Sequence, residues 1–171
     1  MNDIYAYTVP VFIKILGGLK LILIKAKADA DAGKFEEAAL VNDKIAADMF
    51  PFKKQVQIAT DHAKGAASRL SGNEAPKFED TEETIDALVA RVDKTIEYLK
   101  TITEESFAEA KDRHITLSYF PGKYMTGFDY AREYAIPNFF FHVTTAYALI
   151  RKNDVAIGKA DYVNGLPFRD I

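Results

Sequence analysis

The segment that decides the fold is PNFFFHVTTAY, residues 137–147. Three consecutive phenylalanines precede His142, one of three histidines in the chain. Apolar residues continue at helical spacing and leave no clearly polar side, which is the pattern of a buried helix. The sequence therefore predicts a helix over residues 128–151 that places an imidazole in the interior. Pro137 either begins this helix or kinks it, because proline cannot donate a hydrogen bond to Glu133.

Three further segments have the apolar spacing of helices. Apolar side chains recur at intervals of three and four in residues 10–32, 53–71 and 82–101. Ahead of the third segment, Asp80 and Glu83 have the spacing of a capping box. Four helices of this length are most economically arranged as an all-α four-helix bundle. The long first and third connections allow a crossover in place of a simple up-and-down topology.

Residues 112–127 do not have helical spacing. In the stretch HITLSYFPGKYMTG, apolar residues alternate with polar ones and a proline–glycine pair marks a turn. This pattern predicts a short extended excursion or hairpin before the last helix. The C-terminal residues 153–171 are predicted to be irregular. We expect a single domain over residues 1–171, with its core in about residues 5–152.

The composition excludes several classes of protein. The net charge is −3, with 25 acidic and 22 basic residues, which argues against a nucleic-acid surface. The chain has no cysteine, so it forms no disulfides and offers no thiolate ligands or nucleophiles. Two lysines and two glycines interrupt the apolar run from Val11 to Ile24, which indicates neither a membrane span nor a signal peptide. A cytoplasmic location is expected.

Polar side chains share one face of the last predicted helix. Asn138 and His142 are four residues apart, and Thr145 lies one turn further on. Buried polar groups need partners, since each unsatisfied group costs roughly 1–3 kcal/mol. His62 lies at the edge of the apolar face of the second helix, and two helices that each offer an inward histidine are how metal sites are built in bundle cores.

Three interpretations of these residues stay open. The first is a polar network that fixes the register of the helices, the second is a site for zinc or nickel, and the third is a small-molecule pocket without metal. The candidate metal ligands are His62, His142 and Asn138. The residues predicted to line a pocket are Asp61, Thr145, Tyr130 and Tyr147. No motif of an established catalytic site is present, so the sequence assigns no catalytic residue.

Four segments of the chain resemble a known family. They are TVPVFIKIL near the start, DMFPFKKQVQIATDHAKGAASRL in the second helix, FEDTEET before the third, and IPNFFFHVTTAYALIRKNDVAIGK at the end. In this order they resemble an uncharacterised domain-of-unknown-function family that is grouped with the DinB/YfiT-like helical bundles. The resemblance covers about residues 5–163.

The resemblance implies a DinB-like four-helix bundle that forms a homodimer through helix faces. In the wider superfamily, a histidine of the second helix and two of the last helix, spaced H-x-x-x-H, hold a divalent metal. Some members act as thiol-dependent transferases or metal-dependent hydrolases. By position, His142 matches the second histidine of the last helix, Asn138 stands in place of the first, and His62 matches the second-helix ligand only approximately. The metal set is therefore reduced.

Three functions are compatible with the sequence. The first is a homodimeric bundle whose cavity near His62, Asn138 and His142 binds a small ligand. The second is a metal-dependent enzyme of the DinB kind, in which the metal would activate a water or a thiol. The third is a structural or partner-binding module that uses the first helix around Gly17 and Gly18, where two mid-helix glycines allow close approach of another helix, such as one from a second subunit.

Overall fold

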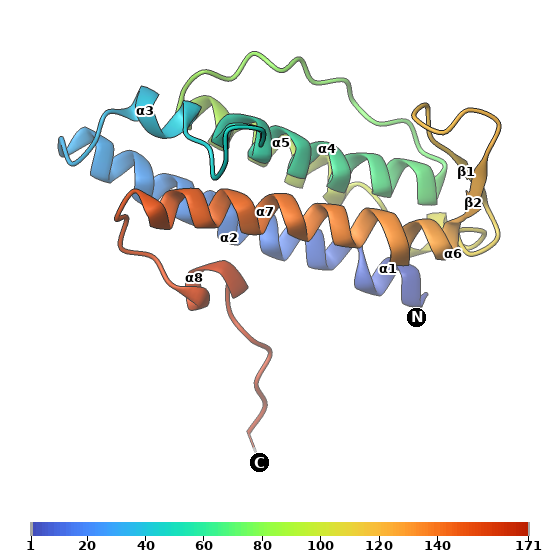
Figure 1. The fold of residues 1–171 in the computed structure, drawn as a ribbon. Helices are drawn as coiled ribbons and strands as arrows, with labels where there is room; N and C mark the ends of the chain where they lie inside the picture. The colour runs from blue at the N-terminus through green and yellow to red at the C-terminus, as the bar shows by residue number, and fades with distance from the viewer. Residues whose placement is uncertain (1, 171) are drawn as a thin grey trace.

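The computed structural model describes residues 2–170. Four long helices form the body of the molecule (Figure 1). They are α2 (Val9–Asp31), α4 (Phe52–Ser71), α5 (Ile85–Lys100) and α7 (Ile136–Lys152). The main contacts join α2 to α5, α5 to α4 and α4 to α7. These contacts confirm the predicted all-α bundle.

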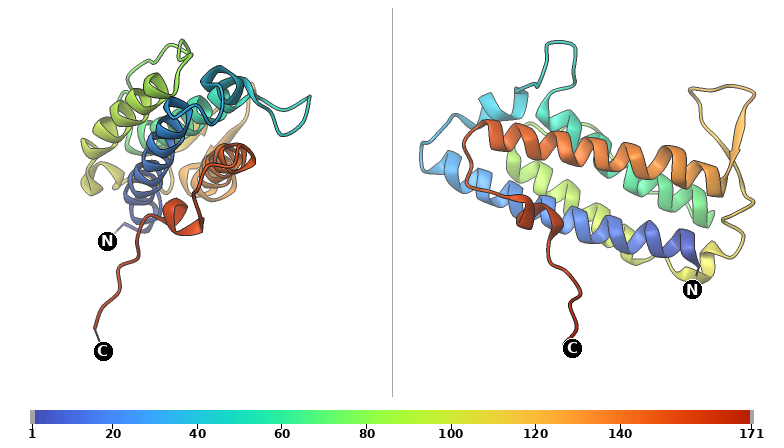
Figure 2. Two further views of the ribbon diagram at one scale, coloured as in Figure 1. Left: turned by 90° about the vertical axis from the view of Figure 1, so that its left-hand side faces the viewer. Right: turned by 60° about the horizontal axis from the view of Figure 1, so that its bottom comes forward.

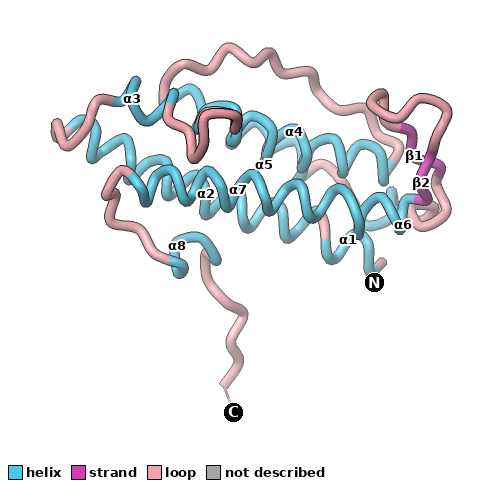
Figure 3. The backbone as a smooth tube through the Cα atoms, in the orientation of Figure 1, coloured by secondary structure: helices cyan, strands magenta, loops and turns pink. Residues whose placement is uncertain are grey.

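Short elements lie at the ends and on the outside of the bundle. They are α1 (Asp3–Tyr7), α3 (Glu37–Asn42), the 3-10 helix η1 (Glu104–Phe107), β1 (His114–Thr116), β2 (Tyr124–Thr126), α6 (Gly127–Asp129), the π-helix η2 (Tyr130–Ala135) and α8 (Lys159–Val163). The two strands form the predicted hairpin, with Ile115 opposite Met125. This hairpin lies at the end of the bundle where α7 begins (Figure 3).

The crossover lies in neither of the two connections whose length allowed one. Helices α4 and α5 run in the same direction. The segment that connects them, residues 72–84, runs back along the outside of the bundle (Figures 1 and 2). The crossover is thus the second connection, not the first or the third. The predicted capping box is also wrong, because α5 begins later. Its N-cap is Thr84, whose hydroxyl accepts a hydrogen bond from the Ala87 amide, while Asp80 forms ion pairs with Lys54 and Arg91.

The last helix has a π-helical lead-in. In η2 the backbone bonds span five residues, and the amide of Ile136 donates to the carbonyl of Ala131. Pro137 follows in the first turn of α7, where a missing N–H is tolerated. The helix is less buried than its composition predicts. Phe139 is fully buried and packs 4.4 Å from Phe12 between ring centroids, whereas Phe141 is 54% exposed.

The C-terminal segment contains a helix that the sequence did not predict. Helix α8 packs against α2, and the Asn164 side chain donates to the Lys14 carbonyl at 2.9 Å. A Cβ at Gly18 would lie 2.9 Å from the carbonyl oxygen of Asp161 and one at Gly17 would lie 3.1 Å from the Asn164 amide nitrogen. The two glycines therefore allow the close approach of another helix, as expected, and this helix is α8 of the same chain instead of one from a second subunit.

The first helical stretch is apolar along most of its length. By length and composition, residues 3–31 form a helix that could cross a membrane, although half of the most apolar part is buried inside the bundle. Its buried side chains include Phe12, Leu16, Leu19 and Leu23. This stretch is longer than the interrupted run from Val11 to Ile24, because α1 leads directly into α2. Its buried face supplies a large part of the hydrophobic core.

Candidate functional site

A cavity of about 540 Å³ lies beside α4, with walls from α7, η2 and the hairpin loop. His62 and Arg69 line it from α4, His142 from α7, and Tyr134 from η2. The hairpin loop, residues 117–123, contributes Leu117 and Tyr119 to the cavity wall. The volume is in the range of small-molecule sites in proteins, roughly 300–1,000 Å³.

The two histidines meet at the wall of this cavity. The rings of His62 and His142 are stacked, with centroids 5.6 Å apart and planes inclined by 15°. The ring of Tyr134 lies 5.6 Å from that of His62. His142 is 8% exposed and His62 is partly buried. The structure thus brings together two side chains that are separated by eighty positions in the sequence.

Gln55 of α4 fixes the orientation of the His142 ring. Its side-chain oxygen lies 2.8 Å from Nδ1 of His142, and its side-chain nitrogen donates to the carbonyl of Phe50 at 2.9 Å. Because the Gln55 nitrogen is used by that carbonyl, its oxygen accepts and Nδ1 of His142 must carry the proton. In the neutral ring, Nε2 then keeps its lone pair. The orienting residue Gln55 was not predicted from the sequence.

Both imidazoles are kept neutral by their surroundings. Burial, with a contribution from the neighbouring His62, lowers the pKa of His142 from 6.5 to about 4. Burial and the positive charge of Arg69 lower the pKa of His62, against an opposing effect of Asp61. At neutral pH the pair therefore presents hydrogen-bonding nitrogens without positive charge. In residues 2–170, neither ring nitrogen of His62 has a hydrogen-bond partner.

The other predicted site residues are distributed differently. The side chain of Asn138 donates to the Tyr134 carbonyl at 2.6 Å, the backbone bond that the network interpretation expects. The hydroxyl of Thr145 likewise donates to the Phe141 carbonyl at 2.7 Å. Neither residue lines the cavity. Tyr147 packs against Tyr162 of the α8 segment, with ring centroids 5.8 Å apart, and also lies outside the cavity.

Tyr130 contacts two residues that line the cavity, Arg69 and Tyr134. It is fully buried, its hydroxyl accepts a hydrogen bond from Arg69 at 3.3 Å, and its ring stacks on Tyr134 with centroids 5.7 Å apart. The π-helix η2 places both tyrosines on the side of α4. Such π-helical turns often occur at functional sites. Tyr130 thus positions two lining residues without lining the cavity itself.

Asp61 lines the cavity and belongs to an ion-pair network around Arg91. Arg91 is 2% exposed, and its guanidinium contacts Asp61 at 2.9 Å, Asp80 at 3.1 Å and Glu82 at 3.2 Å. Its Nε donates to the hydroxyl of Thr60 at 2.8 Å. The network ties the crossover connection to α4 and α5. Asp61 is therefore held by two cations, Arg91 and Lys64.

The residues of the site do not make the metal set of the superfamily. A catalytic zinc site takes three protein ligands and an open position. In the part of the chain that the structure describes, no group of three His, Cys, Asp or Glu side chains is placed to hold a metal. Asn138, the third candidate ligand, bonds to the backbone through its amide. The arrangement instead suits hydrogen bonding, because Nε2 of His142 can accept a hydrogen bond or a proton.

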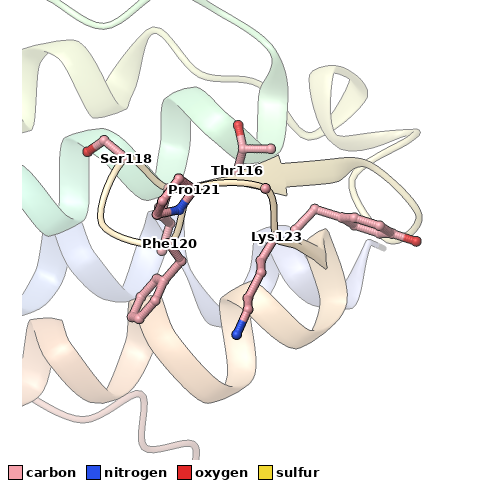
Figure 4. A pocket seen from close by; sticks show the side chains of 8 residues that line it. Thr116, Ser118, Phe120, Pro121 and Lys123 are labelled. Carbon is pink, nitrogen blue, oxygen red and sulfur yellow. The ribbon is translucent and has the colours of Figure 1, made fainter.

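A second cavity of about 420 Å³ lies within the hairpin loop itself (Figure 4). Its walls include Thr116, Ser118, Phe120, Pro121 and Lys123. Lys123 is the charged side chain among its lining residues. No histidine or carboxylate lines this cavity. His62 and His142 line the cavity beside α4 instead.

Comparison with known proteins places the whole chain in one group. The family model described as "Domain of unknown function (DUF1993)" matches residues 4–163. A crystal structure of a DinB family member protein from Shewanella denitrificans is similar, with 41% sequence identity and a TM-score of 0.93. The match covers 98% of this chain and 95% of that one. None of the curated proteins matches the chain. The structural likeness confirms the DinB-like fold that the sequence predicted.

Proposed function

This chain belongs to the DUF1993 family of DinB-like proteins, and from that premise we propose that it binds a small organic molecule in the cavity beside His62 and His142. The observation that carries the proposal is the pair of stacked, neutral imidazoles at the wall of a 540 Å³ cavity. Both imidazoles line the cavity, and their nitrogens that lack a partner in residues 2–170 can form hydrogen bonds with a ligand that enters it.

The ligand is expected to donate a hydrogen bond to His142. Gln55 holds the proton on Nδ1, which leaves the lone pair of Nε2 as an acceptor. A hydroxyl or amine group of the ligand is the complementary donor. The apolar side chains of Ile58, Leu117 and Tyr119 would contact the body of the ligand. The low pKa of His142 means that this acceptor persists in mildly acidic solution.

The hairpin loop would act as the cover of the cavity. Leu117 and Tyr119 line the cavity from this loop, yet Tyr119 is 80% exposed. A loop whose aromatic side chain contacts both solvent and cavity can move without disturbing the core, because few of its side chains are buried. Ligand entry is therefore proposed to occur past Tyr119.

Calorimetric titration with phenol tests the proposal. Phenol offers one hydroxyl donor on an apolar ring, and it should bind the wild-type protein. An Ile58→Trp variant places an indole in the cavity and should abolish binding. The matched control is Ile96→Trp, at a partly buried position on α5 outside the cavity, which should bind phenol as the wild type does. Equal phenol affinity in the Ile58→Trp variant would show that phenol binds elsewhere and would refute the proposal.

A further inference from the structure

We propose that the ligand of this cavity is a small organic monocarboxylate and that Arg69 binds its carboxylate group. This inference rests on the ligand-binding function proposed above and adds the chemical class of the ligand. It is drawn from the balance of charges in the cavity wall, from the placement of the Arg69 guanidinium, and from the apolar surfaces beside it.

The charges in the cavity wall are paired with one exception. Asp61 is paired with Arg91 at 2.9 Å and with Lys64 at 3.2 Å. Asp80 is paired with Arg91 at 3.1 Å and with Lys54. Arg69 has no carboxylate within 4.0 Å in residues 2–170. The cavity therefore contains one guanidinium whose charge no protein group balances, which favours an anionic ligand.

Arg69 lines the same cavity as the two histidines. Arg69 lies seven residues after His62, two turns along the same face of α4. Both residues line the same cavity, and the positive charge of Arg69 lowers the pKa of His62. Nη1 of Arg69 donates to the hydroxyl of Tyr130 at 3.3 Å, and this bond holds one end of the planar group. The remaining N–H groups are available to a carboxylate, which accepts two parallel hydrogen bonds from arginine.

A glycine makes room for this placement. A Cβ at Gly65 would lie 2.5 Å from Nη1 of Arg69, so any larger residue at this position would displace the guanidinium. Glycine is the least favourable residue for a helix interior apart from proline, and Gly65 lies within α4. The helix thus accommodates an unfavourable residue where the guanidinium folds back over it. A substitution at Gly65 therefore moves the Arg69 guanidinium while Arg69 itself stays unchanged.

The other residues that line the cavity indicate the net charge of the ligand and the polarity of the part that does not bind Arg69. Arg69 is the unpaired arginine or lysine among the lining residues, which suits a single carboxylate. Phe50, Ile58 and Tyr134 supply apolar and aromatic surface. The expected ligand is thus an apolar or aromatic acid with a hydroxyl or amine donor for Nε2 of His142.

Calorimetric titration with 4-hydroxybenzoate and 4-hydroxybenzamide tests the inference. The two compounds have nearly the same shape and share the hydroxyl donor, but only the first has a carboxylate. The wild-type protein should bind the benzoate at least about tenfold more tightly, the lower end of what a charge-assisted hydrogen bond contributes. The preference should weaken as salt is raised, because Arg69 is exposed to solvent.

Variants assign the preference to Arg69. Arg69→Gln should bind both compounds with the affinity of the amide, and Gly65→Ala should weaken benzoate binding several-fold while the helix remains folded. Arg132→Gln is the matched control, because Arg132 is an exposed arginine outside this cavity that pairs with Glu133 at 2.9 Å. It should keep the wild-type preference.

The outcomes separate the two proposals. Equal affinity of the wild type for both compounds, or a preference that survives Arg69→Gln, would overturn the carboxylate inference while leaving ligand binding intact. Binding of phenol without binding of the benzoate would do the same. If phenol and both test compounds fail to bind, the proposed function itself is refuted. Loss of benzoate binding in Arg69→Gln with unchanged amide binding supports both.

Discussion

Protonation of His142 is expected to destabilise the folded protein in mild acid. Its pKa is lowered from 6.5 to about 4, mainly by burial. The unfolded chain therefore takes up a proton at this residue as the pH falls through about 6.5, whereas the folded chain does so only near pH 4. Stability from this group is fully present above pH 6.5 and is lost as the pH falls toward 4.

The size of this loss follows from the two pKa values. The complete effect is about 3 kcal/mol, of which about 2 kcal/mol is lost between pH 7 and pH 4.5. His62, whose pKa is also lowered, adds a loss of the same sign. The carboxyls of Asp80 and Asp161 have pKa values below 3.8, so their stabilising effect is lost only in stronger acid. The pKa of the Glu105 carboxyl is lowered from 4.5, so its effect begins to be lost near the acid end of the interval from pH 7 to pH 4.5. Comparison of the wild type with a His142 variant over this interval isolates the contribution of the histidine.

Urea unfolding followed by circular dichroism at pH 7 and pH 4.5 measures the effect. His142→Gln removes the titrating group, so its free energy of unfolding should fall by about 2 kcal/mol less than that of the wild type over this interval. His114→Gln, on the exposed hairpin, is the matched control and should keep the wild-type drop. If His142→Gln loses as much stability as the wild type, His142 is not held neutral by the fold and the reasoning is refuted.

Three further changes test other parts of the structure. Gln55→Leu removes the partner of His142 and should cost about 1–3 kcal/mol in urea unfolding; no loss would contradict the orienting bond. Arg91→Met leaves the carboxylates of Asp61, Asp80 and Glu82 without their shared cation and should lower the free energy of unfolding by about 3 kcal/mol. A free energy of unfolding equal to that of the wild type would contradict the role of this ion-pair network. Gly18→Ala should displace α8 and speed tryptic cleavage in the α8 segment. Gly158→Ala is the control and should not change this rate, because a Cβ at Gly158 meets no atom within 4 Å. Equal cleavage rates in the two variants would contradict the packing of α8 against Gly18.

The four long helices and the hairpin were predictable because their signals are local. Apolar spacing of three and four residues marks a helix wherever the segment is packed, and the alternation around Ile115 marks a strand. Which of the connections forms the crossover was not predictable in this way. Arg91 of α5 forms ion pairs with Asp80 and Glu82 of the crossover, and contacts between separate segments leave no common period in the sequence.

The candidate site was predictable in part. The convergence of His62 and His142 was inferred from inward positions on two helices, and the structure places the two rings side by side. Gln55 was missed, although a glutamine beside the apolar stripe of α4 is a signal for a buried hydrogen-bond partner. The absence of a carboxylate partner for Arg69 could not be predicted from the sequence, because it depends on where each nearby carboxylate lies in the fold. The homodimer expected from the family resemblance stays a prediction.

The claim at the centre of the account is that a neutral imidazole pair receives the ligand. Long-range ¹H–¹⁵N spectra of the histidine side chains at pH 5.5, before and after addition of phenol, test it most directly. We predict that His142 is neutral with its proton on Nδ1, and that phenol shifts the signals of His62 and His142 but not those of His114. A His142 imidazolium at this pH, or a pair of rings that does not respond to phenol, would contradict the account.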